Sequence, residues 1–264
     1  MKHARVAYAG AIHDATPAEG GVRLIDGRMV AEDAVIWLPP LQPRTIFAVG
    51  LNYADHAKEL SFQAPKEPLI FLKGPRSICG HRAQTRRPAG VKHMHYECEL
   101  AVAIGRLARN VTRSDAYQYV AGYTVANDYA IRDYLENYYR PNFRVKSRDS
   151  ATPLGPWLVD AADVPDPMNL RLRTLVNGTI TQEGSTCDMI FDIPALIAYL
   201  SEFMTLDAGD VILTGTPEGL ADVKVGDEVI TEVEGIGRLQ NTIVGDDVFH
   251  IAGPPPAAKT AGVT

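Results

Sequence analysis

The stretch that decides the fold is His95-Tyr96-Glu97-Cys98-Glu99-Leu100-Ala101-Val102-Ala103-Ile104, in which charged groups give way to a β-prone apolar run. On a strand, successive side chains point to opposite faces, so Glu97 and Glu99 project to the same side. Two carboxylates one pleat apart at the head of a buried run are unfavourable unless a cation neutralises them. The alternative is a solvated strand edge at which both glutamates face water.

A third carboxylate, Asp128, lies near the end of a second apolar stretch, Val120-Ala-Gly-Tyr-Thr-Val-Ala-Asn-Asp-Tyr129. Carboxylate oxygens are hard ligands of the kind that Mg²⁺ and Mn²⁺ prefer. Three such ligands from two strands would leave coordination positions open for water or substrate. Glu97, Glu99 and Asp128 are therefore the candidate ligands of one Mg²⁺ or Mn²⁺ ion.

The composition is that of an acidic globular chain. The 264 residues carry a formal net charge of -6, with a pI near 5.6, which argues against binding to nucleic acid or to an anionic membrane. No apolar run approaches the roughly 18–20 residues of a membrane helix, and the first residues lack the apolar core of a signal peptide. Three widely spaced cysteines (Cys79, Cys98 and Cys187) predict reduced thiols in a cytoplasmic protein.

Three parts can be distinguished along the chain. Residues 1–42 contain short strand and turn patterns, including a hairpin around Asp26-Gly27, and are expected to form a small β N-terminal piece. Residues 43–250 form the main, catalytic domain. Residues 251–264 include a run of prolines and are expected to be a disordered tail.

Strand patterns outnumber helix patterns in the main domain. Residues 170–176 alternate cleanly, and Asn177-Gly178 after them is a preferred hairpin turn. Residues 192–204 have the best helical pattern, with Pro194 tolerated in the first turn. Because strands and helices do not alternate regularly, the predicted class is mainly β, α+β, with a few short helices.

Two other patterns carry less weight. Gly235-Ile-Gly237 is half of a dinucleotide-binding fingerprint, but it lacks the third glycine and the strand-turn-helix context, so we interpret it as a hairpin bend. His93 and His95 alternate with the two glutamates and would allow a zinc site. A hydrogen-bonding role beside the carboxylates is favoured for them instead.

Five motifs in the same order resemble the fumarylacetoacetate hydrolase superfamily over about residues 45–245. They are Gly50-Leu-Asn-Tyr-Ala-Asp-His-Ala-Lys-Glu59, His95-Tyr-Glu-Cys-Glu99, Asn127-Asp128, Lys146-Ser-Arg-Asp149 and Leu213-Thr-Gly-Thr-Pro217. Residues 127–142 are further similar to the catalytic half of the isomerase/decarboxylases of homoprotocatechuate catabolism, in which two homologous halves are fused. Here one half follows a short β segment, so a homodimer or higher homo-oligomer would replace the fused partner.

The resemblance implies a mixed β-roll or flattened barrel in which Glu97, Glu99 and Asp128 hold the metal. It also implies a lid helix bearing His56 and Glu59. On a helix, residues three apart share one face, and taken alone such a pair is an ordinary surface feature.

Two further positions match the family's site residues. Lys146 would lie near the metal; the alternative is that it is an ordinary solvent-exposed lysine in a loop. Thr216 would hold a substrate carboxylate, where the alternative is a plain turn. A polycarboxylate substrate also needs cations for its distal groups, and the candidates are Lys73, Arg132, Arg140 and Arg144, since ammonium and guanidinium groups suit carboxylates.

The implied activity is metal-dependent decarboxylation of 5-oxopent-3-ene-1,2,5-tricarboxylate, isomerisation of 2-hydroxyhepta-2,4-diene-1,7-dioate, or both, through a metal-bound dienolate. The ligands are thus 2-oxo or 2-hydroxydienoic di- or tricarboxylates. The same metal site would also suit an acylpyruvate hydrolase of the fumarylpyruvate type or an oxaloacetate decarboxylase. A non-catalytic metal-binding or oligomer-forming domain is the alternative from another class, and the retained His56, Glu59 and Lys146 argue against it.

Overall fold

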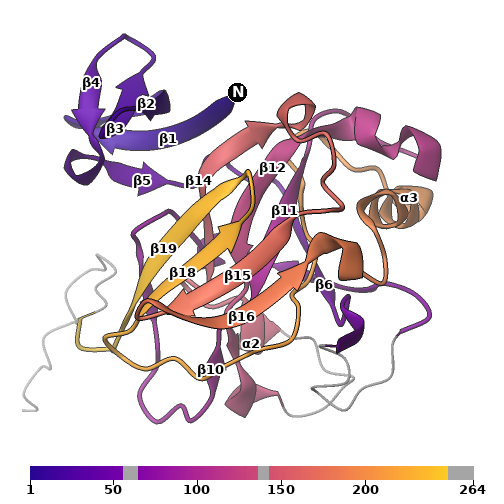
Figure 1. Cartoon of the computed structure of the whole chain (residues 1–264). Coiled ribbons are helices and arrows are strands. Elements are labelled where there is room, and N and C mark those ends of the chain that lie inside the picture. Colours follow the sequence, from indigo (N-terminus) through magenta and orange to yellow (C-terminus); the bar gives the residue numbers. More distant parts are fainter. Residues whose placement is uncertain (56–64, 136–142, 249–264) are drawn as a thin grey trace, which may run out of the picture.

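Strands make up most of the regular structure, and two large sheets packed face to face give the molecule its layers (Figure 1). In the computed structural model of the protein, the described residues are 1–55, 65–135 and 143–248. Helices are few and short in this part of the chain. The predicted mainly β, α+β class is confirmed, and the tail predicted at residues 251–264 lies outside the described residues.

The first forty residues form short strands, as the turn residues predicted. The expected hairpin joins two of them, with Gly27 at φ +90° in its turn. A small core that includes Val6, Leu24 and Trp37 holds this part together. Its elements are β1 (Lys2–Tyr8), β2 (Ala11–Ala18), β3 (Gly21–Leu24), β4 (Met29–Ala31), the 3₁₀ turn η1 (Glu32–Ala34) and β5 (Ile36–Leu38).

The larger sheet continues from β1 into the main domain, in the order β4-β3-β2-β1-β14-β12-β11-β17-β6-β7. β5 and β8 pair with β1 and β14 beside this path. The strands of the main domain in this sheet are β6 (Ile46–Gly50), β7 (Leu69–Lys73), β8 (Ile78–Cys79), β11 (Cys98–Ile104), β12 (Val120–Asn127), β14 (Thr152–Asp160) and β17 (Val211–Leu213).

A five-stranded sheet, in the order β16-β15-β18-β19-β9, lies in front of the larger one in Figure 1. Asn177 and Gly178 both have positive φ, +51° and +80°, which is the geometry of the tight hairpin their sequence predicts. A separate pair, β10 (Met94–His95) with β13 (Ala130–Ile131), flanks the sheets. The five strands are β9 (Gln84–Arg86), β15 (Arg171–Val176), β16 (Thr179–Ser185), β18 (Glu228–Val233) and β19 (Gly237–Val244).

The longest helix, α3 (Ile193–Phe203), begins where the sequence predicts it. The Asp192 carboxylate caps it by accepting a hydrogen bond from the Ala195 N–H at 2.8 Å, and Pro194 lies in its first turn. Elsewhere in the fully described segments, the helical elements of the main domain are α2 (Phe143–Lys146) and the 3₁₀ turns η2 (Pro75–Ser77), η3 (Arg113–Tyr119), η4 (Arg132–Tyr134), η5 (Ala161–Asp163) and η6 (Thr186–Asp188).

The main core fills the space between the two sheets and α3. The larger sheet contributes Leu100 and Val125, the five-stranded sheet Leu172 and Leu239, and the helix Leu196, all almost fully buried. Since burying each large aliphatic side chain contributes about 1.5–3 kcal/mol, this core fixes how the sheets lie on each other.

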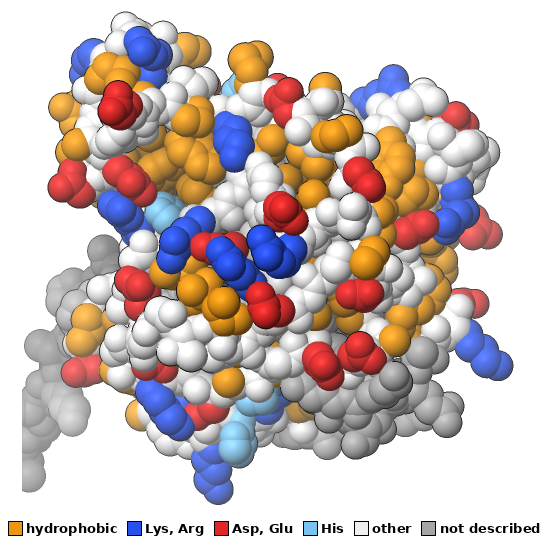
Figure 2. Space-filling model, in the orientation of Figure 1, with side chains coloured by type: hydrophobic (Ala, Val, Ile, Leu, Met, Phe, Trp, Pro, Cys, Tyr) orange, Lys and Arg blue, Asp and Glu red, His pale blue; other side chains and the backbone are white. Residues whose placement is uncertain are grey.

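The surface carries mixed charge. Acidic and basic side chains are interspersed over the face shown in Figure 2. On the five-stranded sheet, Glu232 pairs with Arg173 on one neighbouring strand and with Arg238 on the other. No helix in the described part of the chain has the length and apolar character needed to cross a membrane.

His81 joins the N-terminal strands to the main domain. Its ring packs edge-on against Trp37 of β5, with centroids 5.2 Å apart, and its Nδ1 accepts a hydrogen bond from the Gln240 N–H of β19 at 3.1 Å. Burial, with a smaller contribution from the Arg82 charge, lowers the pKa of His81 from its ordinary 6.5 to about 4, although Glu32 acts in the opposite direction.

This lowered pKa predicts acid-sensitive folding. Between pH 6.5 and pH 4 the unfolded chain binds a proton at His81 that the folded chain does not, so stability falls as pH falls through this window, by up to about 3 kcal/mol. His81→Gln keeps a hydrogen-bond acceptor but cannot be charged. Urea unfolding of both proteins from pH 7 to pH 4.5 should show a shallower loss of stability for the variant; equal slopes would contradict the assignment.

Candidate metal centre

Three carboxylates meet at one end of the central strand pair. Glu97 directly precedes β11, Glu99 is its second residue, and Asp128 directly follows β12. The antiparallel register pairs Cys98 with Asn127, so the start of one strand lies beside the end of the other. One oxygen from each carboxylate lies within 4.8 Å of the others. The structure therefore brings the three predicted ligands together.

All three carboxylates are buried, with 6% of Glu97 and 1% each of Glu99 and Asp128 exposed. The backbone holds them in place, because the Asp128 N–H donates to the Glu97 carbonyl at 3.0 Å. The Asn127 side-chain oxygen accepts from the Glu97 N–H, also at 3.0 Å. A solvated strand edge, the alternative for the two glutamates, is excluded by this burial.

Three cations oppose the carboxylates. The Lys146 ammonium lies 2.5 Å from Glu97 Oε2 and 2.9 Å from Asp128 Oδ2. Arg132 Nη2 lies 2.7 Å from Glu97 Oε1, and the fully buried Lys73 ammonium donates to Asp128 Oδ1. Lys146 is thus near the predicted ligands, as expected. Lys73 and Arg132 contact the carboxylates of the acidic cluster, whereas the sequence predicted them at the distal carboxylates of the substrate.

The electrostatics differ among these groups. Burial, reinforced by the charges of Asp128 and Glu97, raises the pKa of Glu99 well above its usual range. For Lys146 burial lowers the pKa, but Asp128 and Glu97 outweigh it and the net shift is upward. Burial also dominates at Lys73 and lowers its pKa. Burial of the ionised Glu99 carboxylate is therefore unfavourable in the absence of a further positive charge.

The chemistry of the donors fits a divalent cation. No lysine, arginine or histidine among the described residues forms an ion pair with Glu99, whose Oε2 accepts only from the Gly215 N–H at 2.7 Å. Each carboxylate oxygen of Asp128 meets a lysine and, like any carboxylate oxygen, has two acceptor positions. Three buried oxygen ligands without histidine or cysteine suit Mg²⁺ or Mn²⁺ better than Zn²⁺.

The segment after β17 closes one side of the centre. Gly215 adopts φ +90°, and a Cβ there would lie 2.9 Å from the Asn52 Cβ, so the tight turn that presents its N–H to Glu99 needs glycine. Asn52 fixes the same turn by donating to the Thr214 carbonyl at 2.8 Å. Thr216 follows, buried, so the structure places the predicted carboxylate-binding threonine next to the turn that contacts Glu99.

Several other predicted site residues are not part of the acidic cluster or lie outside the described residues. Arg144 is exposed, and its guanidinium stacks over the Tyr134 ring at 4.1 Å. His95 is half-buried, with its Nδ1 3.4 Å from Arg132 Nε, in keeping with a hydrogen-bonding role. His56, Glu59 and Arg140 lie outside the described residues.

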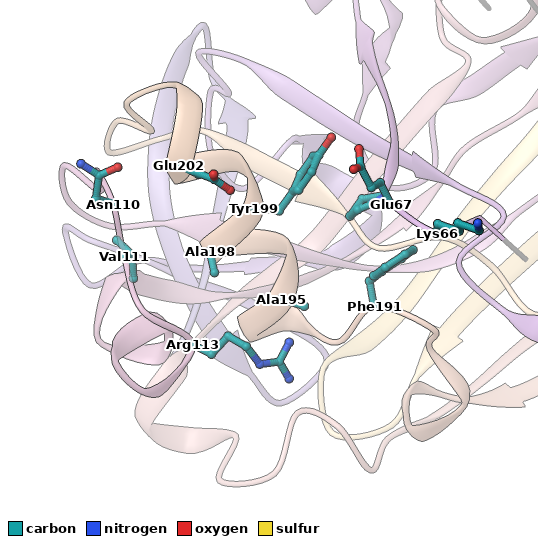
Figure 3. Close-up of a pocket in the computed structure, with 11 residues that line it drawn as sticks. Lys66, Glu67, Asn110, Val111, Arg113, Phe191, Ala195, Ala198, Tyr199 and Glu202 are labelled. Atoms are coloured by element: carbon teal, nitrogen blue, oxygen red, sulfur yellow. The ribbon is translucent and has the colours of Figure 1, made fainter.

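A pocket of about 530 Å³ lies beside α3 (Figure 3). Val111, Phe191 and Tyr199 supply apolar lining, and Arg113 at its edge is paired with Asp192 at 2.7 Å. None of the lining residues belongs to the acidic cluster. The pocket contains no group of metal ligands and is not part of the candidate centre.

Sequence reasoning missed two buried amides that support the site. Asn52 accepts from the Phe191 N–H at 2.8 Å and donates to the Phe191 carbonyl at 3.0 Å. Gln182 donates to Thr216 Oγ1 at 2.9 Å. The strand alternation around residue 182 was the available signal, because it points that polar side chain inward, opposite the exposed Glu183.

Comparison with known proteins identifies relatives. The protein-family model described as fumarylacetoacetate (FAA) hydrolase C-terminal matches residues 45–244. A 4-hydroxyphenylacetate degradation bifunctional isomerase/decarboxylase of Salmonella dublin is 58% identical over 233 residues, which cover 86% of this chain and 54% of that protein. A homoprotocatechuate catabolism bifunctional isomerase/decarboxylase of Escherichia coli is 62% identical over 203 residues, covering 77% and 47%. The chain spans about half the length of these curated relatives.

Among solved structures, the 5-carboxymethyl-2-hydroxymuconate delta-isomerase from Mycobacterium smegmatis superimposes with a TM-score of 0.82 at 38% identity. The match covers 93% of this chain and 99% of that one. The resemblance predicted from five short motifs therefore extends over the whole fold, the N-terminal strands included.

Glu99→Gln should have opposite effects on metal binding and stability. The amide keeps an acceptor for the Gly215 N–H but removes a buried charge, so the metal-free protein should become more stable, by about 1–2 kcal/mol. Mn²⁺ binding, measured by calorimetry, should weaken at least about 100-fold, since one of three anionic ligands is lost. Glu183→Gln, at an exposed glutamate, is the matched control. Unchanged Mn²⁺ affinity in Glu99→Gln would remove the metal assignment.

Proposed function

The chain belongs to the fumarylacetoacetate hydrolase family, and from that premise we propose that it is a divalent-metal-dependent decarboxylase/isomerase of aromatic-compound catabolism. Its substrates would be 5-oxopent-3-ene-1,2,5-tricarboxylate, 2-hydroxyhepta-2,4-diene-1,7-dioate, or both. The observation that carries the proposal is the buried group of Glu97, Glu99 and Asp128 with the Lys146 ammonium against it.

The cofactor would be Mg²⁺ or Mn²⁺, held by Glu97, Glu99 and Asp128. When bound, such an ion supplies Lewis-acid polarisation of the ketone and carboxylate oxygens of a 2-oxo acid. The chain's contribution is to exclude water from this point, since the three ligands are at most 6% exposed. In a site of low dielectric, each fixed charge acts more strongly on the reacting atoms.

Lys146 is the residue best placed to stabilise the reaction's charge. Loss of CO₂ breaks a carbon–carbon bond and leaves its electron pair in the conjugated system, so negative charge develops on the former ketone oxygen. Isomerisation of the 2-hydroxydiene passes through the same dienolate once its enol hydroxyl loses its proton, and reprotonation at carbon then gives the 2-oxo product. The buried ammonium of Lys146 would oppose that charge in both steps, and its raised pKa keeps it protonated.

Proton transfer needs a further group. We assign it to His56, oriented by Glu59, on the motif they share with the family. Protonation at one carbon or another of the dienolate then decides which isomer is released.

The substrate's carboxylates need fixed partners. Thr216 would donate to the carboxylate next to the reacting ketone. Arg132 and Lys73 contact Glu97 and Asp128, so they would bind a substrate group only next to the metal ligands. Arg140 and Arg144 remain candidates for binding the distal carboxylates.

We further propose a cytoplasmic homodimer or higher homo-oligomer, with residues 1–42, 43–250 and 251–264 as its three parts. Cys79, Cys98 and Cys187 are all free thiols, in keeping with a reducing compartment.

A substrate panel tests the function. The tricarboxylate and the dienoate should be turned over, EDTA should abolish turnover, and added Mg²⁺ or Mn²⁺ should restore it. Preference for an acylpyruvate would favour a carbon–carbon hydrolase, preference for oxaloacetate a simple decarboxylase, and no turnover of any compound a non-catalytic domain. Turnover that is indifferent to EDTA would contradict the metal-dependent proposal.

Lys146→Met should lower kcat by about 10²–10³-fold, because one preorganised charge is lost, while Mn²⁺ affinity should not weaken. Lys92→Met, which removes an exposed lysine, is the control and should keep its kcat. A parallel loss of kcat and Mn²⁺ affinity in Lys146→Met would mean that Lys146 supports the metal centre and does not act on substrate.

A further inference from the structure

Gln182 lies buried between the two sheets and uses its whole amide. Its Nε2 donates to Thr216 Oγ1 at 2.9 Å and to the Pro217 carbonyl at 2.8 Å. Its Oε1 accepts from Thr174 Oγ1 at 2.9 Å and from the Cys98 N–H at 3.3 Å. Two donors and two acceptors complete the hydrogen-bonding capacity of a glutamine side chain.

The partners fix which way the amide faces. The Cys98 N–H can only donate, so the atom opposite it must be the amide oxygen. The Pro217 carbonyl can only accept, so the atom opposite it must be the nitrogen. A flipped amide would place its nitrogen against the Cys98 N–H and its oxygen against the Pro217 carbonyl. The partners therefore fix the orientation of the Gln182 amide.

This orientation determines the role of the Thr216 hydroxyl. Because Thr216 Oγ1 accepts a hydrogen bond from Gln182, its own O–H is free to donate to another acceptor, and no acceptor for it is present among the described residues. The neighbouring Gly215 N–H contacts Glu99, so this donor lies beside the candidate metal centre. A hydroxyl that already accepts one hydrogen bond from a buried amide still has its own proton to donate, so an acceptor is the partner that satisfies it best.

We propose that Gln182 is a positioning residue that sets Thr216 as a donor and thereby selects a carboxylate, an acceptor-only group, at this point of the substrate. The inference rests on the proposed role of Thr216 as a substrate contact. A ligand that offers only an N–H or O–H donor here would leave the Thr216 O–H without an acceptor and should bind at least about tenfold more weakly.

The decisive variant is Gln182→Glu. A carboxylate has no donor, and a carboxylic acid has a single proton that the Pro217 carbonyl would take. In either form the Thr216 hydroxyl donates to residue 182 and is lost to the substrate. Gln118→Glu adds the same charge at an exposed glutamine and is the matched control.

Oxalate, a small planar mimic of an enolised 2-oxo acid, is the binding probe, measured by calorimetry on the Mn²⁺-loaded protein. Gln182→Glu should weaken oxalate binding at least about tenfold, because a hydrogen bond to a charged group is lost, while Mn²⁺ affinity and Gln118→Glu stay at the wild-type values. KM for the turned-over substrate should rise by a similar factor, with kcat changed less than about threefold.

A double-mutant cycle separates this role from a structural one. Thr216→Val should weaken oxalate binding as Gln182→Glu does, Thr216→Ser should retain it, and Gln182→Glu combined with Thr216→Val should be no weaker than Thr216→Val alone. Additive losses, or wild-type oxalate affinity in Gln182→Glu, would overturn the inference and leave the metal chemistry standing. Wild-type affinity in Thr216→Val would overturn the substrate role of Thr216 as well.

Discussion

The arrangement depends on one electrostatic constraint: three carboxylates are buried within 4.8 Å of one another at the junction of two strands. Removing a carboxylate from water costs several kcal/mol even after the protein relaxes, and neighbouring like charges add to that cost. Lys146 meets Glu97 and Asp128, and these pairs offset part of it. Within residues 1–55, 65–135 and 143–248, Glu99 accepts only from the Gly215 N–H, so the cost of its burial is offset less than that of the other two carboxylates.

The cations that balance the cluster come from distant parts of the chain. Lys73 ends β7, a strand at the edge of the larger sheet, and Lys146 ends the single turn of α2. The Lys73 ammonium also donates to the Lys146 carbonyl, so the two elements hold each other against the carboxylates. The order of strands in the larger sheet therefore matters for the site, because a different order would separate the buried carboxylates from the lysines that neutralise them.

Features that depend on residues close together in the sequence were predicted correctly. Period-two alternation placed Glu97 and Glu99 on one side, Asn177-Gly178 gave its hairpin, and residues 192–204 gave α3. Lys73 and Arg132 were expected farther out, since no local pattern tells whether a cation at the end of a strand or turn points inward. That choice is made by pairing between segments tens of residues apart, as Arg132 with Glu97. The same limit hid the role of Gln182, whose partners include Cys98 on the other sheet and Thr216 and Pro217 in the segment after β17.

These long-range contacts form a closed ring. The Cys98 N–H bonds Gln182, Gln182 bonds Thr216, and the backbone runs from Thr216 to Gly215. The Gly215 N–H bonds Glu99, which is covalently next to Cys98. A ring of this kind resists shear, because no member can shift without breaking one of these hydrogen bonds in a low-dielectric interior. It follows that the spacing between the carboxylate ligand Glu99 and the Thr216 hydroxyl is set by the packing of the five-stranded sheet on the larger one, so the front sheet fixes the geometry of the site as well as covering the core.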